Sequence, residues 1–227
     1  VTRSSGAPVS GAQVRLVGAV RADVTDDSGR FSFTDLSPGL YLVWATRRGF
    51  STAEALALTA EARKAGAQAA LLISPYYNKP TQEGIYQHYR KIAEGTGLPL
   101  VLYNIPGRTG SRIAPETTGR LSRVPGVIGL KEAGGDLGLT SQTLAASDPE
   151  FALLSGDDSL TLPMLAIGAR GVISTTSNVA PREMTALVHA WLDGDIAGAR
   201  ELHYRLLPLM DALFIETNPI PVKTALA

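Results

Sequence analysis

The chain has 227 residues, of which 44% are hydrophobic, with 21 basic residues balanced by 21 acidic ones and no cysteine. The balance argues against a broad basic face for nucleic acid, and the lack of cysteine excludes disulfides, a thiol nucleophile and thiolate metal sites. No apolar run reaches the about 18 residues of a membrane span, so we expect no membrane segment and a cytoplasmic setting.

Residues 1–50 show the period-two alternation of short β-strands. Turn-forming clusters of Asp, Ser, Gly and Pro separate the strands at 26–29 and 37–39. The pattern predicts a small antiparallel, sandwich-like module. Its alternating apolar residues are Val14, Leu16, Phe31, Phe33, Tyr41, Val43 and Ala45.

Three strings in this region resemble a carboxypeptidase regulatory-like, prealbumin-like module, and the resemblance covers most of residues 4–50. They are GAPVSGA at 6–12, TDDSGRF at 25–31 and LSPGLY at 36–41. Such modules are usually accessory, and nothing in these residues has the pattern of a catalytic site. We therefore divide the chain into this module at 1–50 and a second domain at 51–227.

From residue 51 the pattern changes to apolar strands that alternate with amphipathic helices, which predicts a parallel sheet. Ser51 and Glu54 form a capping box for a first helix that Gly66 can end. The predicted strands are 69–74, 99–104, 127–131, 151–155 and 171–175. The further predicted helices are 82–95, 115–123, 137–147, 158–167, 181–193 and 195–213.

Polar side chains follow these strands at their carboxyl ends, where a (β/α)₈ barrel has its active site. Closure of such a barrel takes eight strands, and five are predicted here. We therefore expect an incomplete TIM barrel that lacks about three βα units. Its unpaired edges would favour self-association and low solubility.

Lys131 ends the predicted strand 127–131, and Tyr103 lies near the end of the strand before it, 28 residues earlier. That spacing corresponds to about one βα unit. A lysine amine can attack a carbonyl to form an imine, and a phenol can relay the protons. The pair predicts imine chemistry on a carbonyl substrate.

Other polar residues have structural interpretations. We expect Glu132 and the pair at 157–158 to cap loops and to form rim hydrogen bonds, not to bind metal. Three histidines lie on separate predicted helices without metal-ligand spacing, so we expect helix-surface roles for them: His88, His189 and His203.

Six strings resemble the dihydrodipicolinate synthase family from about residue 51 to 227. They are SPYYNKPTQEG at 74–84, LYNIPGRTG at 102–110, GLKEA at 129–133, LSGDD at 154–158, GVIS at 171–174 and NPIPVK at 218–223. The wider family includes N-acetylneuraminate lyase, and Arg108 after Ile105 and Pro106 favours the synthase branch. The resemblance implies a (β/α)₈ barrel with C-terminal helices, usually assembled as a homotetramer.

The family condenses pyruvate with aspartate semialdehyde on the route to lysine. The resemblance implies that Lys131 forms the imine with pyruvate, that Tyr103 relays protons, and that Arg108 holds the carboxylate of the semialdehyde. Tyr77 would serve the proton relay of a neighbouring subunit. The implied lining of the pyruvate pocket is Gly156 and Ile173. No metal or organic cofactor is implied, since the imine itself is the electron sink.

The sequence departs from the family at its start. The family's Gly-Thr-Thr-Gly-Glu segment, which supplies a relay threonine and donors for the pyruvate carboxylate, is absent. The first module replaces everything before the third barrel helix, with a junction at about 50/51. Two alternatives therefore stay open: another pyruvate-dependent aldolase or lyase of the same superfamily, or a catalytically defective chimeric fragment.

Overall fold

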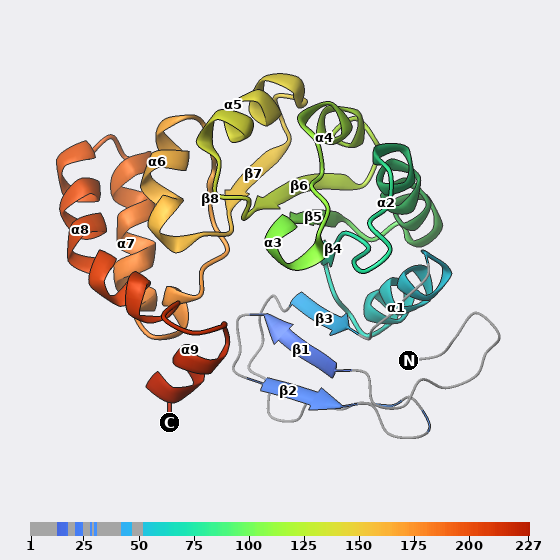
Figure 1. Cartoon of the computed structure of the whole chain (residues 1–227), viewed down its shortest axis with the longest axis horizontal. Coiled ribbons are helices and arrows are strands. Elements are labelled where there is room, and N and C mark those ends of the chain that lie inside the picture. The colour runs from blue at the N-terminus through green and yellow to red at the C-terminus, as the bar shows by residue number, and fades with distance from the viewer. Residues whose placement is uncertain (1–12, 18–20, 25–27, 29, 31–41, 47–51) are drawn as a thin grey trace.

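The computed structural model describes residues 13–17, 21–24, 28, 30, 42–46 and 52–227. Within them two sheets form, one antiparallel and one parallel, and helices cover the outer side of the parallel sheet (Figure 1). The predicted fold class, a partial parallel α/β barrel preceded by a small antiparallel β-module, is confirmed.

The antiparallel sheet has the order β2-β1-β3. Its strands are β1 (Gln13–Val17), β2 (Arg21–Val24) and β3 (Leu42–Thr46). Strands β1 and β3 lie where the alternation predicted them, whereas β2 was not predicted. The predicted positions Phe31, Phe33 and Tyr41, the turn at 37–39 and the capping residue Ser51 lie outside the described residues.

The parallel sheet has the order β4-β5-β6-β7-β8. Its strands are β4 (Ala70–Ile73), β5 (Leu100–Asn104), β6 (Val127–Glu132), β7 (Ala152–Ser155) and β8 (Gly171–Val172). All five were predicted, but β8 ends three residues early. Beyond the strand, the N–H groups of Thr175 and Thr176 donate to the Asp158 carboxylate.

The helices follow the strands in the predicted βα order. Their bounds are α1 (Thr52–Lys64), α2 (Gln82–Thr96), α3 (Pro106–Thr109), α4 (Pro115–Leu121), α5 (Leu137–Ala146), α6 (Thr161–Ala166), α7 (Pro181–Leu192), α8 (Ile196–Ala212) and α9 (Ile220–Ala225). The short helices α3 and α9 were not predicted. The predicted helix 158–167 begins as a 3₁₀ turn, η1 (Asp158–Leu160), and a second such turn, η2 (Thr176–Asn178), precedes α7.

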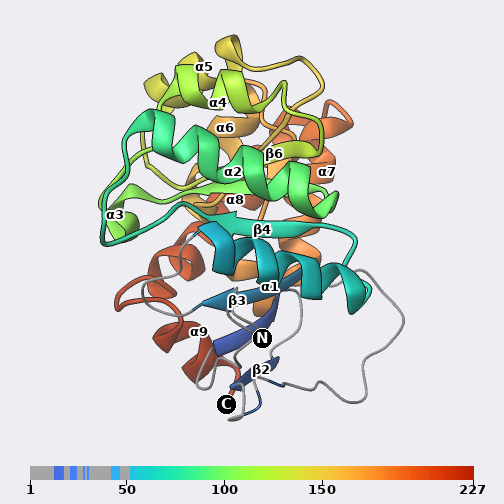
Figure 2. The same cartoon turned by 90° about the vertical axis from the view of Figure 1, so that its right-hand side faces the viewer.

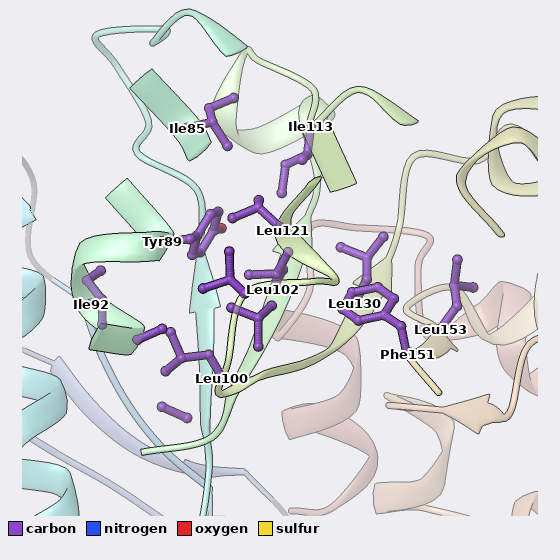
Figure 3. Packing of buried hydrophobic residues seen from close by; sticks show 14 of the residues in the cluster. Ile85, Tyr89, Ile92, Leu100, Leu102, Ile113, Leu121, Leu130, Phe151 and Leu153 are labelled. Atoms are coloured by element: carbon purple, nitrogen blue, oxygen red, sulfur yellow. The ribbon is translucent and has the colours of Figure 1, made fainter. Parts of the chain in front are cut away.

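The main core lies between the parallel sheet and its covering helices (Figure 3). Leu102 of β5 and Leu130 of β6 are fully buried there in one cluster with Tyr89 of α2, and each such leucine contributes about 1.5–3 kcal/mol. Successive strand residues point to opposite faces. The residues that follow these leucines, Tyr103 and Lys131, therefore lie on the opposite, concave face of the sheet.

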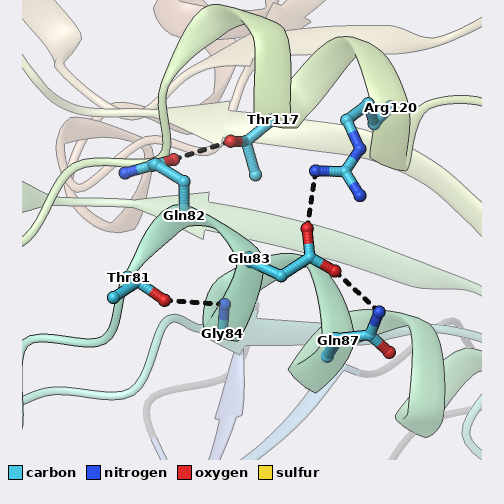
Figure 4. Close-up of polar contacts among 7 residues, drawn as sticks. All are labelled: Thr81, Gln82, Glu83, Gly84, Gln87, Thr117 and Arg120. Atoms are coloured by element: carbon cyan, nitrogen blue, oxygen red, sulfur yellow. Dashed lines mark hydrogen bonds and ion pairs between the residues drawn. The ribbon is translucent and has the colours of Figure 1, made fainter.

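Polar contacts fix α2 against α4 (Figure 4). The Thr81 hydroxyl caps α2 by accepting a backbone N–H of its first turn at 3.1 Å. The Thr117 hydroxyl donates to the Gln82 side chain at 2.7 Å, and Arg120 pairs with Glu83 at 2.9 Å. The exposed ion pair adds little stability, so the Thr117–Gln82 bond and the core contribute more to the position of α2.

Among the described strands, β4 pairs only with β5, and β8 pairs only with β7. A cavity of about 290 Å³ lies beside β8, lined by Val172, Met184 and Val188 among others. Strand β3 lies next to β4 without joining its ladder (Figure 2). The expected self-association through these edges stays a prediction.

In the part of the chain that the structure describes, every helix is too short or too polar to cross a bilayer.

Candidate active site

Lys131 and Tyr103 lie directly opposite each other on neighbouring strands, near the carboxyl end of the sheet. The Lys131 Nζ lies 4.3 Å from the centroid of the Tyr103 ring. The structure therefore brings together the two residues that the sequence spacing paired. A primary amine beside a phenol is the minimum arrangement for imine formation with proton relay.

Burial lowers the pKa of the Lys131 amine to about 8. The negative charge of Asp158 limits this fall, and the positive charge of Arg108 contributes to it. Burial has the largest effect because the ammonium form loses its hydration there. A larger fraction of the amine is therefore neutral near physiological pH than for an exposed lysine, as nucleophilic attack requires.

Burial raises the pKa of the Tyr103 hydroxyl to about 12. The charge of Arg108 opposes that rise, and the charge of Asp157 adds to it. Tyr103 is therefore a neutral phenol at physiological pH. It can donate its proton to a developing oxyanion and recover it from a neighbouring group.

Arg108 lies in α3, at the exposed rim of the site. Its Nη2 donates to the carbonyl oxygen of Asn218 at 3.0 Å, across 110 residues of chain. A guanidinium has five N–H groups, so this bond leaves further donors for a carboxylate. The charge of Arg108 acts on both Lys131 and Tyr103, which is consistent with a position over the same concave face.

Gly156 follows β7 and packs beneath the lysine. A Cβ at this position would lie 2.9 Å from the Lys131 Cε and 2.9 Å from the Ala133 Cβ. Ala133 offers no flexible end that could move away. The absence of a side chain at 156 therefore allows Lys131 to take its present position.

We expect Gly156→Ala to slow trapping of a carbonyl adduct on Lys131 by about a hundredfold, since a shift of about 1 Å at a reacting group has an effect of this size. The measurement is the rate of borohydride-trapped adduct by mass spectrometry. Gly107→Ala is the control, because a Cβ at 107 meets nothing within 4 Å. Equal rates in the two variants would contradict the packing role of Gly156.

The remaining predicted site residues are Ile173 and Tyr77. Ile173 follows β8 and is held by its N–H, which donates to the Ser155 carbonyl oxygen at 2.8 Å. Tyr77 is 87% exposed, with a positive φ of 72°. Its side chain therefore points to solvent, where a residue that serves a neighbouring subunit would lie.

Glu132 and Asn104 form a buried clamp directly behind the pair. The Asn104 Nδ2 donates to Glu132 Oε2 at 2.7 Å, and the Gly134 N–H donates to Glu132 Oε1 at 2.6 Å. The Ile113 N–H donates to Asn104 Oδ1 at 3.0 Å, which closes the loop after β5. The structural role predicted for Glu132 is consistent with these bonds, but the partner Asn104 was not predicted. The only signal was its place directly after Tyr103.

The two aspartates after β7 have different environments. Asp158 is 1% exposed, and its Oδ2 accepts the N–H groups of Thr175 at 3.0 Å and Thr176 at 2.9 Å. This is the loop-capping role predicted for it. Burial, and then the charge of Asp158, raise the pKa of Asp157.

The predicted surface roles of the histidines are correct for His189 and wrong for two others. His88 is 6% exposed and His203 is 9% exposed. Burial lowers the pKa of His88 to about 4, and its Nδ1 lies 3.0 Å from the Thr52 hydroxyl. The packing of α1 over α2 covers His88, and helical periodicity alone did not reveal this. Among the described residues, no group of three His, Asp or Glu side chains is arranged to hold a metal.

Two family models match the chain. The model of the dihydrodipicolinate synthetase family matches residues 43–227, and that of the carboxypeptidase regulatory-like domain matches residues 1–71. Both resemblances seen in the sequence are therefore confirmed. The two matches overlap, so the junction at about 50/51 stays a prediction.

Curated proteins and solved structures are similar to most of this chain. The 4-hydroxy-tetrahydrodipicolinate synthase of Thermodesulfovibrio yellowstonii is 55% identical over 177 residues, which are 78% of this chain and 61% of that protein. The dihydrodipicolinate synthase structure from Thermotoga maritima is 47% identical with a TM-score of 0.76, over 78% of this chain and 61% of that one. The Acinetobacter baumannii enzyme, crystallised with pyruvate, is 46% identical with a TM-score of 0.75, over 78% and 60%.

The chain spans about three fifths of the length of the curated relatives that it matches. The matched part includes Lys131, Tyr103 and Arg108. The matched part therefore contains the amine, the phenol and the guanidinium of the candidate site.

Proposed function

The chain belongs to the dihydrodipicolinate synthetase family, and from that premise we propose that it condenses pyruvate with aspartate semialdehyde through an imine on Lys131. The reaction is that of a lyase in the diaminopimelate route to lysine. The observation that carries the proposal is the Lys131 amine, with a pKa of about 8, 4.3 Å from the Tyr103 ring centroid.

In the first half of the reaction, the neutral Lys131 Nζ attacks C2 of pyruvate and forms a C–N bond. Tyr103 donates a proton to the oxygen that leaves as water, and the carbinolamine becomes an iminium ion. Tyr103 suits this role because it is protonated at physiological pH. Gly156 and Ile173 line the space in which pyruvate lies.

In the second half, the Tyr103 phenolate left by the first half takes a C3 proton, which converts the iminium ion to an enamine. C3 of the enamine attacks the aldehyde carbon, and the aldehyde oxygen receives the proton from Tyr103. The guanidinium of Arg108 holds the carboxylate of the semialdehyde, with the planar geometry that suits such a pair. The amino group of the bound product then attacks the imine carbon. This ring closure releases Lys131 with its amine restored, and no metal or organic cofactor takes part.

We also propose a cytoplasmic homotetramer. The support for an oligomer is Tyr77, whose side chain is 87% exposed and is available to a second copy. In this arrangement Tyr77 serves the proton relay of the neighbouring subunit.

A substrate panel tests the activity. Purified chain is given pyruvate with aspartate semialdehyde, pyruvate with other aldehydes, and N-acetylneuraminate, and product is measured in a coupled assay. We expect turnover with the semialdehyde to exceed the other reactions. A preference for another aldehyde would identify a different pyruvate-dependent aldolase, and no turnover with any substrate would identify a catalytically defective chain.

A further inference from the structure

We propose that the buried carboxylate of Asp158 positions the guanidinium of Arg108 through a chain of hydrogen bonds across the carboxyl ends of the strands. The inference rests on the proposed function, because Arg108 matters only if it holds the second substrate. Asp158 touches no substrate in this scheme and is a positioning residue.

The chain of bonds has three links between loops that are far apart in sequence. The Thr175 N–H donates to Asp158 Oδ2 at 3.0 Å. The Asn218 Nδ2 donates to the Thr175 hydroxyl at 3.3 Å, and the Arg108 Nη2 donates to the Asn218 carbonyl oxygen at 3.0 Å. The links connect the loops after β7, β8 and α8 to α3, which follows β5.

Thr175 is the centre of this chain because each of its polar groups is used. Its N–H binds Asp158 and its hydroxyl binds Asn218, while its carbonyl oxygen accepts the N–H and the Nδ2 of Asn178 at 3.1 and 2.9 Å. The backbone bonds hold the main chain of Thr175 in place, and the hydroxyl is held by its bond with Asn218. A fixed hydroxyl gives Asn218, and through it Arg108, a defined position.

Asp158 is costly to bury, which argues for a role beyond closing one turn. It is 1% exposed, and its Oδ1 has no hydrogen-bond partner among the described residues. Its negative charge raises the pKa of Lys131, against burial and the charge of Arg108. Two other titratable side chains lie near Lys131 and Asp158. Tyr103 lies against Lys131, and Asp157 is next to Asp158. Asp158 therefore acts on the lysine by charge and on the arginine by hydrogen bonds.

Two neighbouring threonines provide a matched test. Thr175→Val removes the hydroxyl that binds Asn218 but keeps the backbone bond to Asp158. Thr176→Val is the control, because the Thr176 N–H also binds Asp158 while its buried hydroxyl has no partner among the described residues. Asp158→Asn, which keeps the shape and loses the charge, is the third variant.

Two measurements are made on each variant. The first is amide hydrogen exchange by mass spectrometry over residues 215–220 without substrate. The second is a kinetic comparison of two quantities: the KM for aspartate semialdehyde, and the rate at which borohydride traps the pyruvate adduct. For Thr175→Val we expect faster exchange at 215–220 and a rise in this KM of about fivefold, the size for one lost hydrogen bond, with adduct formation unchanged. Thr176→Val should match the unmodified chain in both.

For Asp158→Asn we expect adduct formation to extend to lower pH, because the charge that favours the ammonium form of Lys131 is gone. Thr175→Val should leave this pH dependence unchanged. Equal exchange at 215–220 in Thr175→Val and Thr176→Val would overturn the positioning role. Absence of any adduct in the unmodified chain would instead contradict the proposed function, and the exchange comparison would still decide the positioning role.

Discussion

Lys131→Arg will abolish the pyruvate adduct that borohydride traps on this chain, and carbon–carbon bond formation with it. Arginine keeps the positive charge and most of the length of the side chain, but its guanidinium stays protonated in proteins and cannot act as a nucleophile. The loss should be complete, because no other step can replace the missing C–N bond. Intact-protein and peptide mass spectrometry measure the adduct and its position.

The pH dependence of the adduct adds a second criterion. Attack requires the neutral amine, whose pKa in the fold is about 8, so adduct formation should rise with pH through about 8 and level off above it. Lys91→Arg, on the exposed side of α2, is the control and should behave as the unmodified chain does. An adduct that persists in Lys131→Arg, or a rise centred near the pKa of an exposed lysine, would contradict the assignment.

The low pKa of Lys131 also affects stability. The unfolded chain holds the proton more tightly than the folded one between about pH 8 and the normal lysine pKa of about 10.4. Folding stability should therefore gain from this group as pH rises through that window, and the gain should be absent in Lys131→Arg. The same burial that makes the amine reactive destabilises its charged form at neutral pH.

Glu132→Ala will lower the stability of the barrel part by about 3 kcal/mol, which corresponds to about 10 °C in the melting temperature of a chain of this size. The substitution leaves the Asn104 Nδ2 and the Gly134 N–H without the carboxylate that both bind. Each unpaired buried donor costs about 1–3 kcal/mol. Thermal unfolding measured by circular dichroism tests the prediction.

Two further variants serve as comparisons for Glu132→Ala. Glu201→Ala, at an exposed position of α8, should change the melting temperature little. Glu132→Gln should restore part of the loss, since its amide oxygen accepts one of the two bonds while its NH₂ group faces the other donor. A melting temperature for Glu132→Ala equal to that of Glu201→Ala would show that the clamp does not stabilise the fold.

The local pattern of the sequence was sufficient to predict the five parallel strands and the central pair of Tyr103 and Lys131. Apolar runs about one βα unit apart predict neighbouring parallel strands, and alternation along each strand determines which face a residue takes. Tyr103 and Lys131 each follow a core leucine, so both had to lie on the face opposite the helices. Their register on β5 and β6 then brings them opposite each other.

Contacts between distant loops could not be predicted from the sequence, because they form only in the tertiary structure. The bond from Arg108 to Asn218 spans 110 residues, and that from Asn104 to Glu132 spans 28. Asp158 binds the N–H groups of two residues beyond β8, and Thr52 of α1 lies against His88. Periodicity records which face of its own element a residue occupies, but these contacts depend on how separate elements pack, which no single stretch of sequence specifies.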